Sequence, residues 1–282
     1  MEILSVQGLT KNYPGFTLDG VSFSLEEGYI LGFIGRNGAG KTTTLKSMLG
    51  FVRPDAGSVC ILGRDFTQDE AFCKKNIGLV FGEFPYYRNK KLSVITEVTR
   101  RFYEQWDEET YQSLLKKFSL DENKKILELS AGMKVKYSLA LALSHRARLL
   151  LLDEPTSGLD PVSRDELMQI FRDIVSDGEH SILFSTHILS DLDHCADQIV
   201  YIRGGKIVEN CDIETLKEKY RLVSGTKAQL EEVRDALFGY QENAFGFIGL
   251  AEASAEKDFP KLTYARPTVE DIMVYREKEE RA

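Results

Sequence analysis

The sequence has few cysteines, no excess of basic charge and no long apolar run. Its four cysteines are scattered over 282 residues without a C-x-x-C pair or a metal-like spacing, so we expect reduced thiols in a cytoplasmic protein. Acidic residues outnumber basic ones by 44 to 36, which argues against a nucleic-acid partner because such binding needs a basic face. No apolar run approaches the roughly 18 residues that span a bilayer. The first residues also lack the basic and apolar regions of a signal peptide, and we expect none.

Segments with strand and helix patterns alternate along most of the chain. Residues 1–30 contain short alternating segments separated by Pro-Gly and Gly turns, which are typical of strands. The stretch at about 84–145 is mostly helical in pattern, and past 215 the pattern changes to a small mixture of strands and helices. This order predicts an α/β core over 1–215 that contains a helical insertion, followed by an accessory region over 216–282.

The segment GRNGAGKT fits the pattern G-x-x-x-x-G-K-[ST], with an apolar strand before it and a helical pattern after it. Its glycines let the backbone wrap a phosphate without Cβ clashes: Gly35, Gly38 and Gly40. Lys41 supplies a point charge for the β- and γ-phosphates, and the Thr42 hydroxyl suits Mg²⁺. The context disfavours the alternative of a glycine-rich structural turn. The segment therefore predicts a P-loop that binds a nucleoside triphosphate.

Acidic and imidazole side chains follow two other apolar strands. In RLLLLDEPTSGLD, four leucines lead into Asp153 and Glu154, and SILFSTH ends on His187. Asp153 suits the Mg²⁺ role of a P-loop NTPase, and Glu154 is placed to accept the proton of an attacking water. A histidine alone is more often structural, but parallel strands would bring it to the same sheet edge as Gly35 and Asp153. That convergence favours contact of His187 with a γ-phosphate.

The segment LSAGMK precedes the apolar helical run VKYSLALALS and predicts a second anion site. Ser130 is a favourable N-cap, and Ala131 and Gly132 leave the backbone amides bare at the start of the helix. Unpaired N–H groups and the helix dipole both favour negative charge there. The sequence thus contains two candidate phosphate sites, and the P-loop accounts for only one of them.

Two further features are interpreted as structural from the residues alone. Tyr13, in KNYPGF, could stack on a nucleobase, but packing in the core is the simpler interpretation. A helix is expected after Ser163, with Ser163 and Glu166 as its capping box.

Four motifs in this order, GRNGAGKT, LSAGMK, LLLLDEPTSGLD and FSTH, resemble the Walker A, signature, Walker B with D-loop, and switch-histidine motifs of ATP-binding cassette (ABC) ATPases. The resemblance covers about residues 2–215. The run from LSAGMK to LDEPTSGLDP is most similar to the single-domain ATPases of bacterial ABC-2-type exporters, whose membrane subunit is a separate chain. It implies a P-loop NTPase core with a parallel sheet, an N-terminal antiparallel β subdomain, an inserted helical subdomain and a small C-terminal α+β appendage.

The same resemblance implies ATP and Mg²⁺ as ligands and gives the motif residues their roles. Glu154 would deprotonate water, and His187 would sense the γ-phosphate. Mg²⁺ would be held by Thr42 and Asp153, with Glu83 in place of the family's lid glutamine, although Glu83 could equally be a solvated loop acid. The nucleotide would contact Tyr13, against the packing interpretation above, and the P-loop residues Gly35, Arg36, Asn37, Gly38, Ala39, Gly40, Lys41, Thr42 and Thr43.

The resemblance also explains the second anion site. In ABC ATPases the signature helix closes over the ATP of another cassette, so two chains would face head to tail and bury two ATPs, with Asp160 in the D-loop. The second chain could be identical or a related cassette. Compared with the usual LSGGQ, an alanine replaces a glycine and a methionine replaces the glutamine. The signature residues acting in trans would be Ser130, Ala131, Gly132 and Met133.

The resemblance to ABC ATPases also implies a second partner, which is a separate membrane-spanning permease subunit. One short segment contains three aromatic residues, which form either the docking surface for the permease or local core packing: Phe84, Tyr86 and Tyr87. The chain would then be peripheral on the inner face of the cell membrane. The alternatives are a soluble ABC ATPase that acts on another macromolecule, and a P-loop kinase that transfers phosphate to a small acceptor.

Overall fold

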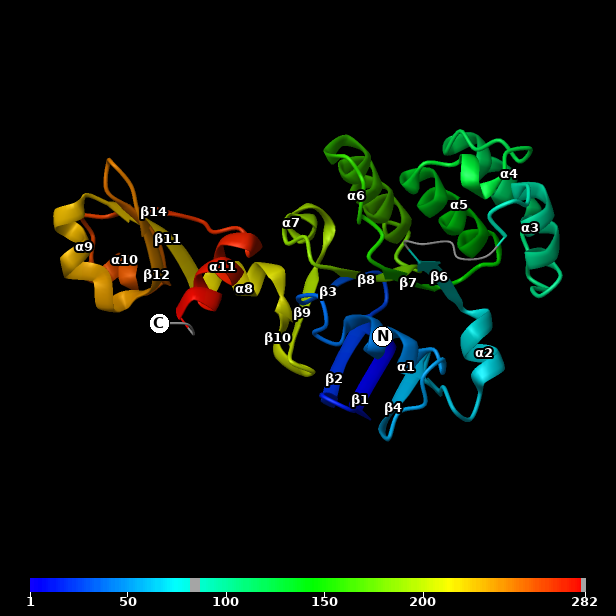
Figure 1. Ribbon diagram of the computed structural model, residues 1–282, viewed down its shortest axis with the longest axis horizontal. Helices are drawn as coiled ribbons and strands as arrows, with labels where there is room; N and C mark the ends of the chain where they lie inside the picture. The colour runs from blue at the N-terminus through cyan, green and yellow to red at the C-terminus, as the bar shows by residue number, and fades with distance from the viewer. Residues whose placement is uncertain (82–86, 280–282) are drawn as a thin grey trace. The chain divides into compact units, whose positions relative to one another are not determined.

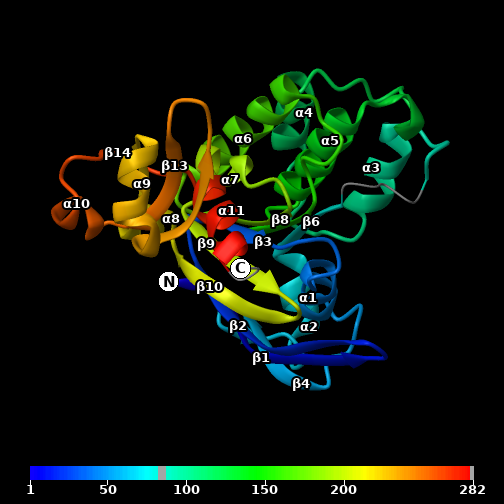
Figure 2. The same ribbon diagram turned by 60° about the vertical axis from the view of Figure 1, so that its left-hand side comes forward.

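A computed structural model of the protein describes residues 1–81 and 87–279, and Figure 1 and Figure 2 show its elements from two directions. It divides into two compact units, Met1–Asn210 and Cys211–Ala282, so the division lies close to residue 215. Among the described residues, no helix is both long enough and apolar enough to cross a bilayer.

The first unit is built on a six-stranded sheet with the strand order β10-β9-β3-β8-β7-β6. The ladders that join β3 to β8 and β9, and β7 to β8 and β6, are parallel. Every residue of β3 and β8 is buried, as expected for parallel strands covered on both faces. The predicted parallel sheet is confirmed. Its strands are β3 (Ile30–Ile34), β6 (Ile77–Phe81), β7 (Leu149–Asp153), β8 (Ser181–Thr186), β9 (Gln198–Arg203) and β10 (Lys206–Asp212).

A separate antiparallel sheet, ordered β2-β1-β4-β5, precedes and interrupts the parallel one in sequence. Its first two strands meet at a Pro14-Gly15 turn, where Gly15 has a φ of 83° that suits the third position of a type II turn. The two sheets share one hydrophobic core, in which the rings of Phe23 and Phe33 stack with centroids 5.4 Å apart. The strands are β1 (Glu2–Tyr13), β2 (Phe16–Glu26), β4 (Ala56–Ile61) and β5 (Arg64–Asp65).

Seven helices are described in the first unit, and three of them form the inserted helical region. In both views these three lie together beside β6, and α5 packs against that strand. The Thr96 hydroxyl ties them to one another, because it bonds the Tyr111 hydroxyl at 2.7 Å and the Tyr137 hydroxyl at 2.9 Å. The inserted helices are α3 (Leu92–Arg100), α4 (Glu108–Lys117) and α5 (Ala131–Ser144). The others are α1 (Lys41–Met48), α2 (Glu70–Lys75), α6 (Pro161–Val175) and α7 (Ser190–Cys195).

The second unit is a small α+β fold, as expected. Its antiparallel sheet has the order β12-β13-β11-β14, and two helices connect the strands in the succession βαββαβ of a ferredoxin-like fold. One face carries a compact apolar cluster that includes Val223, Leu230 and Phe247. The elements are α8 (Ile213–Lys219), β11 (Tyr220–Gly225), α9 (Lys227–Val233), β12 (Leu237–Glu242), β13 (Phe247–Glu252), α10 (Ala255–Asp258), β14 (Thr263–Ala265) and α11 (Val269–Glu279).

Candidate functional site

The glycine-rich segment forms a loop between β3 and α1, in the context that the sequence predicted. A Cβ on Gly35 would come within 2.5 Å of the carbonyl oxygen of Ile202. Gly38 and Gly40 have φ values of 79° and 118°, in the region that side chains disfavour. The loop therefore depends on its glycines, and its amides lead into the start of α1, where helix ends favour anions. The same loop and first helical turn hold Arg36, Asn37, Ala39, Lys41, Thr42 and Thr43.

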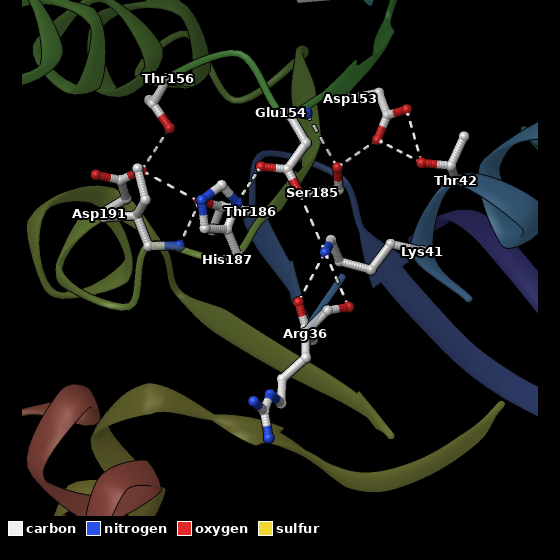
Figure 3. A network of polar contacts seen from close by, with 12 residues as sticks. Arg36, Lys41, Thr42, Asp153, Glu154, Thr156, Ser185, Thr186, His187 and Asp191 are labelled. Atoms are coloured by element: carbon white, nitrogen blue, oxygen red, sulfur yellow. Dashed lines mark hydrogen bonds and ion pairs between the residues drawn. The ribbon is translucent and has the colours of Figure 1, made fainter. Parts of the chain in front are cut away.

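Lys41 is the buried cation of this loop. Its side chain is only 5% exposed, and its Nζ donates to the Gly35 carbonyl oxygen at 2.7 Å. The same Nζ lies 3.1 Å from Oε1 of Glu154, which forms an ion pair across the site. The side chain of Arg36 points away from this cluster in Figure 3, so Lys41 supplies its positive charge.

Thr42 and Asp153 face each other at the carboxyl end of β7. The Thr42 hydroxyl donates to Oδ2 of Asp153 at 3.1 Å, and the Ser185 hydroxyl donates to Oδ1 at 2.6 Å. A hydroxyl and a carboxylate in contact are hard oxygen donors of the kind that Mg²⁺ takes from proteins, with its other ligands from phosphates and water. The donor set therefore fits this ion, even though the described residues contain no cluster of three or more acidic, histidine or cysteine ligands.

Glu154 and His187 are in direct contact, with Oε2 and Nδ1 2.6 Å apart (Figure 3). Glu154 adopts a φ of 51°, which is uncommon for a residue with a side chain and often marks a functional position. Ser185 holds this conformation, because its hydroxyl accepts from the Glu154 amide at 3.0 Å and its carbonyl accepts from the same amide at 3.1 Å. One carboxylate therefore contacts both the imidazole and the buried Lys41.

Strand register explains why these side chains meet. Ile34 pairs with Thr186 and Asp153 pairs with Ser185 in parallel ladders, so β3, β7 and β8 end at the same sheet edge. The expected convergence of Gly35, Asp153 and His187 at one edge is what the fold shows. Ser185, which bonds both acidic residues, was not predicted, because a serine within an apolar strand has no motif of its own.

The segment 129–134 begins helix α5 as predicted. Ser130 is exposed and caps the helix, since its Oγ accepts from the Met133 amide at 3.2 Å. Ala131 forms the first residue of the helix. A Cβ on Gly132 would meet only a Leu159 methyl, at 3.6 Å, so the surface around this glycine is open.

The predicted capping box of Ser163 and Glu166 is wrong, because helix α6 begins earlier. Asp160 is the N-cap, and its Oδ1 accepts from the Val162 and Ser163 amides, each at 3.0 Å. Pro161 follows at the first helical position, where its missing N–H costs nothing. The Ser163 hydroxyl bonds the Asp160 carboxylate, and this bond is the main reason that the pKa of Asp160 is lowered. Asp160 thus fixes the start of α6.

Tyr13 is not a core residue. It ends β1 and is 40% exposed, with the Lys11 ammonium 5.9 Å from its ring centroid, so the packing interpretation is wrong and the ring is free to meet a ligand. Tyr87 is 61% exposed. The predictions for Glu83, Phe84 and Tyr86 lie outside the described residues.

Asp191 is a polar residue near the site that sequence analysis missed. It lies in the first turn of α7, is completely buried, and accepts hydrogen bonds from the hydroxyls of Thr156 and Thr186. In the sequence it is one of three acidic residues in SDLDHCAD, a composition that indicates a solvated helix. Only the fold shows that this carboxylate points inward.

Known proteins resemble this chain in sequence and fold. Residues 18–157 match the family described as ABC transporter. The ABC transporter ATP-binding protein YtrB of Bacillus subtilis is 33% identical over 219 residues, which cover 77% of this chain and 75% of YtrB. The chain belongs to the ABC transporter family. The bacitracin transport ATP-binding protein BcrA of Bacillus licheniformis is 32% identical over 222 residues, covering 78% and 72% of the two chains.

An ABC fold also follows from structural comparison. A solved ATP-binding subunit of an ABC transporter has a TM-score of 0.68 and 26% identity, and the match covers 76% of this chain and 92% of that one. As an ABC ATP-binding subunit the protein binds and hydrolyses ATP. These relatives are named as transporter subunits, which gives no support to a soluble ABC ATPase or to a P-loop kinase.

Proposed function

We propose that ATP binds at the sheet edge where β3, β7 and β8 end, and that each residue there has a separate task. The observation that carries the proposal is the convergence of Lys41, Asp153, Glu154 and His187 within a chain of direct contacts. Lys41 binds the β- and γ-phosphates, the amides of residues 35–43 surround them, and Tyr13 stacks on the adenine. When bound, Mg²⁺ supplies Lewis-acid polarisation of the phosphate oxygens, and Thr42 and Asp153 would hold it.

Glu154 is proposed as the general base, with His187 as its partner. The Glu154 carboxylate accepts the proton of the attacking water, and the His187 contact orients the carboxylate toward the γ-phosphate. Its ion pair with Lys41 shows that the same carboxylate lies within reach of the phosphate-binding cation. Binding of the phosphates next to Lys41 would release Glu154 from this ion pair for use as a base.

The signature segment is proposed to complete the ATP site of a second cassette chain, with Ser130 and the Gly132 amide on the γ-phosphate. Three observations support this: Ser130 is exposed, it caps α5, and the start of this helix has no acidic residue of its own. An added γ-phosphate charge would therefore favour closure of the pair. The simplest pair consists of two identical chains.

Substitution of Ser130 tests the arrangement in trans. Ser130→Arg should lower turnover by about 100-fold or more, because it removes a donor to the transition state and places bulk between the chains. ATP binding to the same chain should be unchanged, as measured by titration calorimetry. Ser113→Arg is the matched control, since Ser113 lies on the exposed face of α4 in the same helical region. Loss of binding equal to the loss of turnover would contradict the proposal.

We propose that ATP hydrolysis by this chain drives a membrane-spanning permease of an exporter. The relative BcrA is named for bacitracin transport, and another at 35% identity, SrtF of Streptococcus pyogenes, for lantibiotic transport. By this likeness the chain is peripheral on the inner face of the cell membrane. Closure of the two chains would draw the helical regions together and move the attached permease.

A groove of about 320 Å³ between the helical region and the parallel sheet is the proposed docking place. Its wall includes Leu79 of β6, the strand that leads into the segment with Phe84, Tyr86 and Tyr87. On the other side Tyr103 stacks on His145, with ring centroids 3.9 Å apart. Burial lowers the pKa of His145 to about 4, so His145 is uncharged at neutral pH and, together with the leucines of the wall, offers apolar contacts to a docking helix.

Thr99, on the rim of this groove in α3, provides its test. Thr99→Arg should abolish co-purification with the permease, because a long charged side chain would fill the groove. ATP hydrolysis by the chain alone should stay near the wild-type rate. Val98→Arg is the control, because Val98 is its neighbour on the same helix but is 46% exposed and lies outside the groove. Equal permease capture by Thr99→Arg and wild type would exclude this docking place.

A further inference from the structure

Asp191 connects the two loops that carry the proposed catalytic residues (Figure 3). Its Oδ2 accepts from the Thr156 hydroxyl at 2.6 Å and from the Thr186 hydroxyl at 3.3 Å. Thr156 comes two residues after Glu154, and Thr186 immediately precedes His187. Both threonines and Asp191 are completely buried, so water does not compete for these bonds. Oδ2 of Asp191 therefore links the two loops through buried hydrogen bonds.

The loop after Glu154 depends on this connection. Glu154 has a positive φ, and such a conformation persists only where the surroundings hold it. A turn follows directly, in which the Ser157 amide donates to the Glu154 carbonyl at 3.2 Å and the Leu159 amide to the Thr156 carbonyl at 3.2 Å. Two hydrogen bonds anchor the turn: the Glu154 amide donates to the Ser185 hydroxyl, and the Thr156 hydroxyl donates to the Asp191 carboxylate.

The stability of the fold does not explain why a carboxylate occupies this position. Its second oxygen, Oδ1, has no hydrogen-bond partner among the described residues, and the nearest cationic atom, Nε of Arg164, is 3.7 Å away and also without a hydrogen bond. Burial raises the pKa of Asp191. A raised pKa means that stability is greatest below the unfolded pKa and is lost as pH rises through the folded one. At neutral pH the charge therefore costs stability, and an uncharged side chain of the same shape should not destabilise the fold.

We propose that Asp191 is a positioning residue for ATP hydrolysis, which holds Glu154 and His187 in register by binding Thr156 and Thr186 through one carboxylate oxygen. The proposal rests on the functions proposed above for Glu154 and His187. It separates two steps: Lys41 and the P-loop bind ATP without Asp191, whereas turnover needs the correct distance between the carboxylate and the imidazole. Small displacements at a reacting centre cost up to about 100-fold in rate.

The test compares substitutions that remove the bonds with substitutions that keep them. Thr156→Val removes the hydroxyl at constant shape, and Thr156→Ser keeps it. Asp191→Leu removes the acceptor oxygen, whereas Asp191→Asn removes the charge and keeps one acceptor oxygen. Thr96→Val is the matched control, because Thr96 is also buried and its hydroxyl also bonds two groups, but in the helical region. For each full-length variant, kcat, KM for ATP, calorimetric ATP affinity and the thermal midpoint are measured.

Thr156→Val and Asp191→Leu are expected to lower kcat by roughly 10- to 100-fold with KM and ATP affinity unchanged. Asp191→Asn should keep most of the rate, because its amide oxygen can accept the same bonds. Thr156→Ser should restore most of the rate. The thermal midpoint of Asp191→Asn should not fall below that of Thr96→Val, whose kcat should remain near wild type. The proposal is overturned if Thr156→Val and Asp191→Leu keep wild-type kcat, or if Thr96→Val loses as much kcat as they do at a similar loss of thermal midpoint.

Glu154→Gln in the same assay separates the proposed positioning function of Asp191 from the proposed base function of Glu154. If Glu154→Gln stops turnover while Asp191→Leu does not, the positioning function fails and the proposed base remains. If Glu154→Gln turns over ATP normally, the assignment of the base fails, whatever the result for Asp191.

Discussion

Glu154→Gln should bind ATP with an affinity close to that of the wild type and hydrolyse it about 10²- to 10⁴-fold more slowly, the usual contribution of a general base. The substitution keeps the size of the side chain and one acceptor oxygen. It removes the charge that contacts His187 Nδ1 at 2.6 Å and Lys41 Nζ at 3.1 Å. Binding persists because the P-loop amides and Lys41 are unaffected. Single-turnover release of phosphate measures the rate.

Glu166→Gln is the control for this prediction. Glu166 is exposed on α6 and pairs with Lys136, so the same chemical change there should leave turnover unaltered. Near-normal turnover by Glu154→Gln would show that the Glu154 carboxylate is not the general base. Its contact with His187 would then be structural.

Lys41→Ala should weaken ATP binding by roughly 30- to 3000-fold. Truncation of one partner in a buried charge pair costs about 2–5 kcal/mol, and each 1.4 kcal/mol is a factor of ten. Lys41 is 5% exposed, so little water can replace its ammonium group next to the phosphates. Its loss also leaves the Glu154 carboxylate without this cation at the site, which would repel ATP. Titration calorimetry with ATP measures the change.

Lys46→Ala provides the comparison, because Lys46 is an exposed lysine in the last turn of the same helix. It should bind ATP like the wild type. Tight binding of ATP by Lys41→Ala would mean that the phosphates are held elsewhere.

The local parts of the fold and site were predictable because short-range chemistry determines them. The loop around Gly38 and Gly40 requires positive φ, and Ser130 caps a helix through a bond to a residue three positions ahead. Apolar strands such as β3 and β8 indicate burial on both faces, which favours a parallel sheet. The motifs at the ends of these strands could therefore be placed at one sheet edge from the sequence.

Contacts between distant segments were not predictable in the same way. Ser185 bonds Asp153 across 32 positions of sequence, and Asp191 bonds Thr156 across 35. Hydroxyls and carboxylates in these segments have no spacing rule, because the partner is chosen by strand order and helix packing. The strand order β12-β13-β11-β14 of the second unit was not predictable for the same reason, since strand pairing is non-local.

The start of helix α6 shows how a local prediction can also fail. Ser163 and Glu166 have the spacing of a capping box, but Asp160 with Pro161 competes for the same helix end three residues earlier. The aspartate prevails because it accepts from two amides, and the proline is preset for the first turn. Two overlapping local patterns cannot be ranked by spacing alone.

Solution mass shows whether ATP closes two copies of this chain around the P-loop of one and the signature segment of the other. Glu154→Gln is measured by light scattering with Mg²⁺, with and without ATP, because slow hydrolysis would preserve the closed state. We expect a monomer without ATP and a dimer with it, and a monomer again when Ser130→Arg is added. A chain that binds ATP at full occupancy and keeps the mass of a monomer would contradict it.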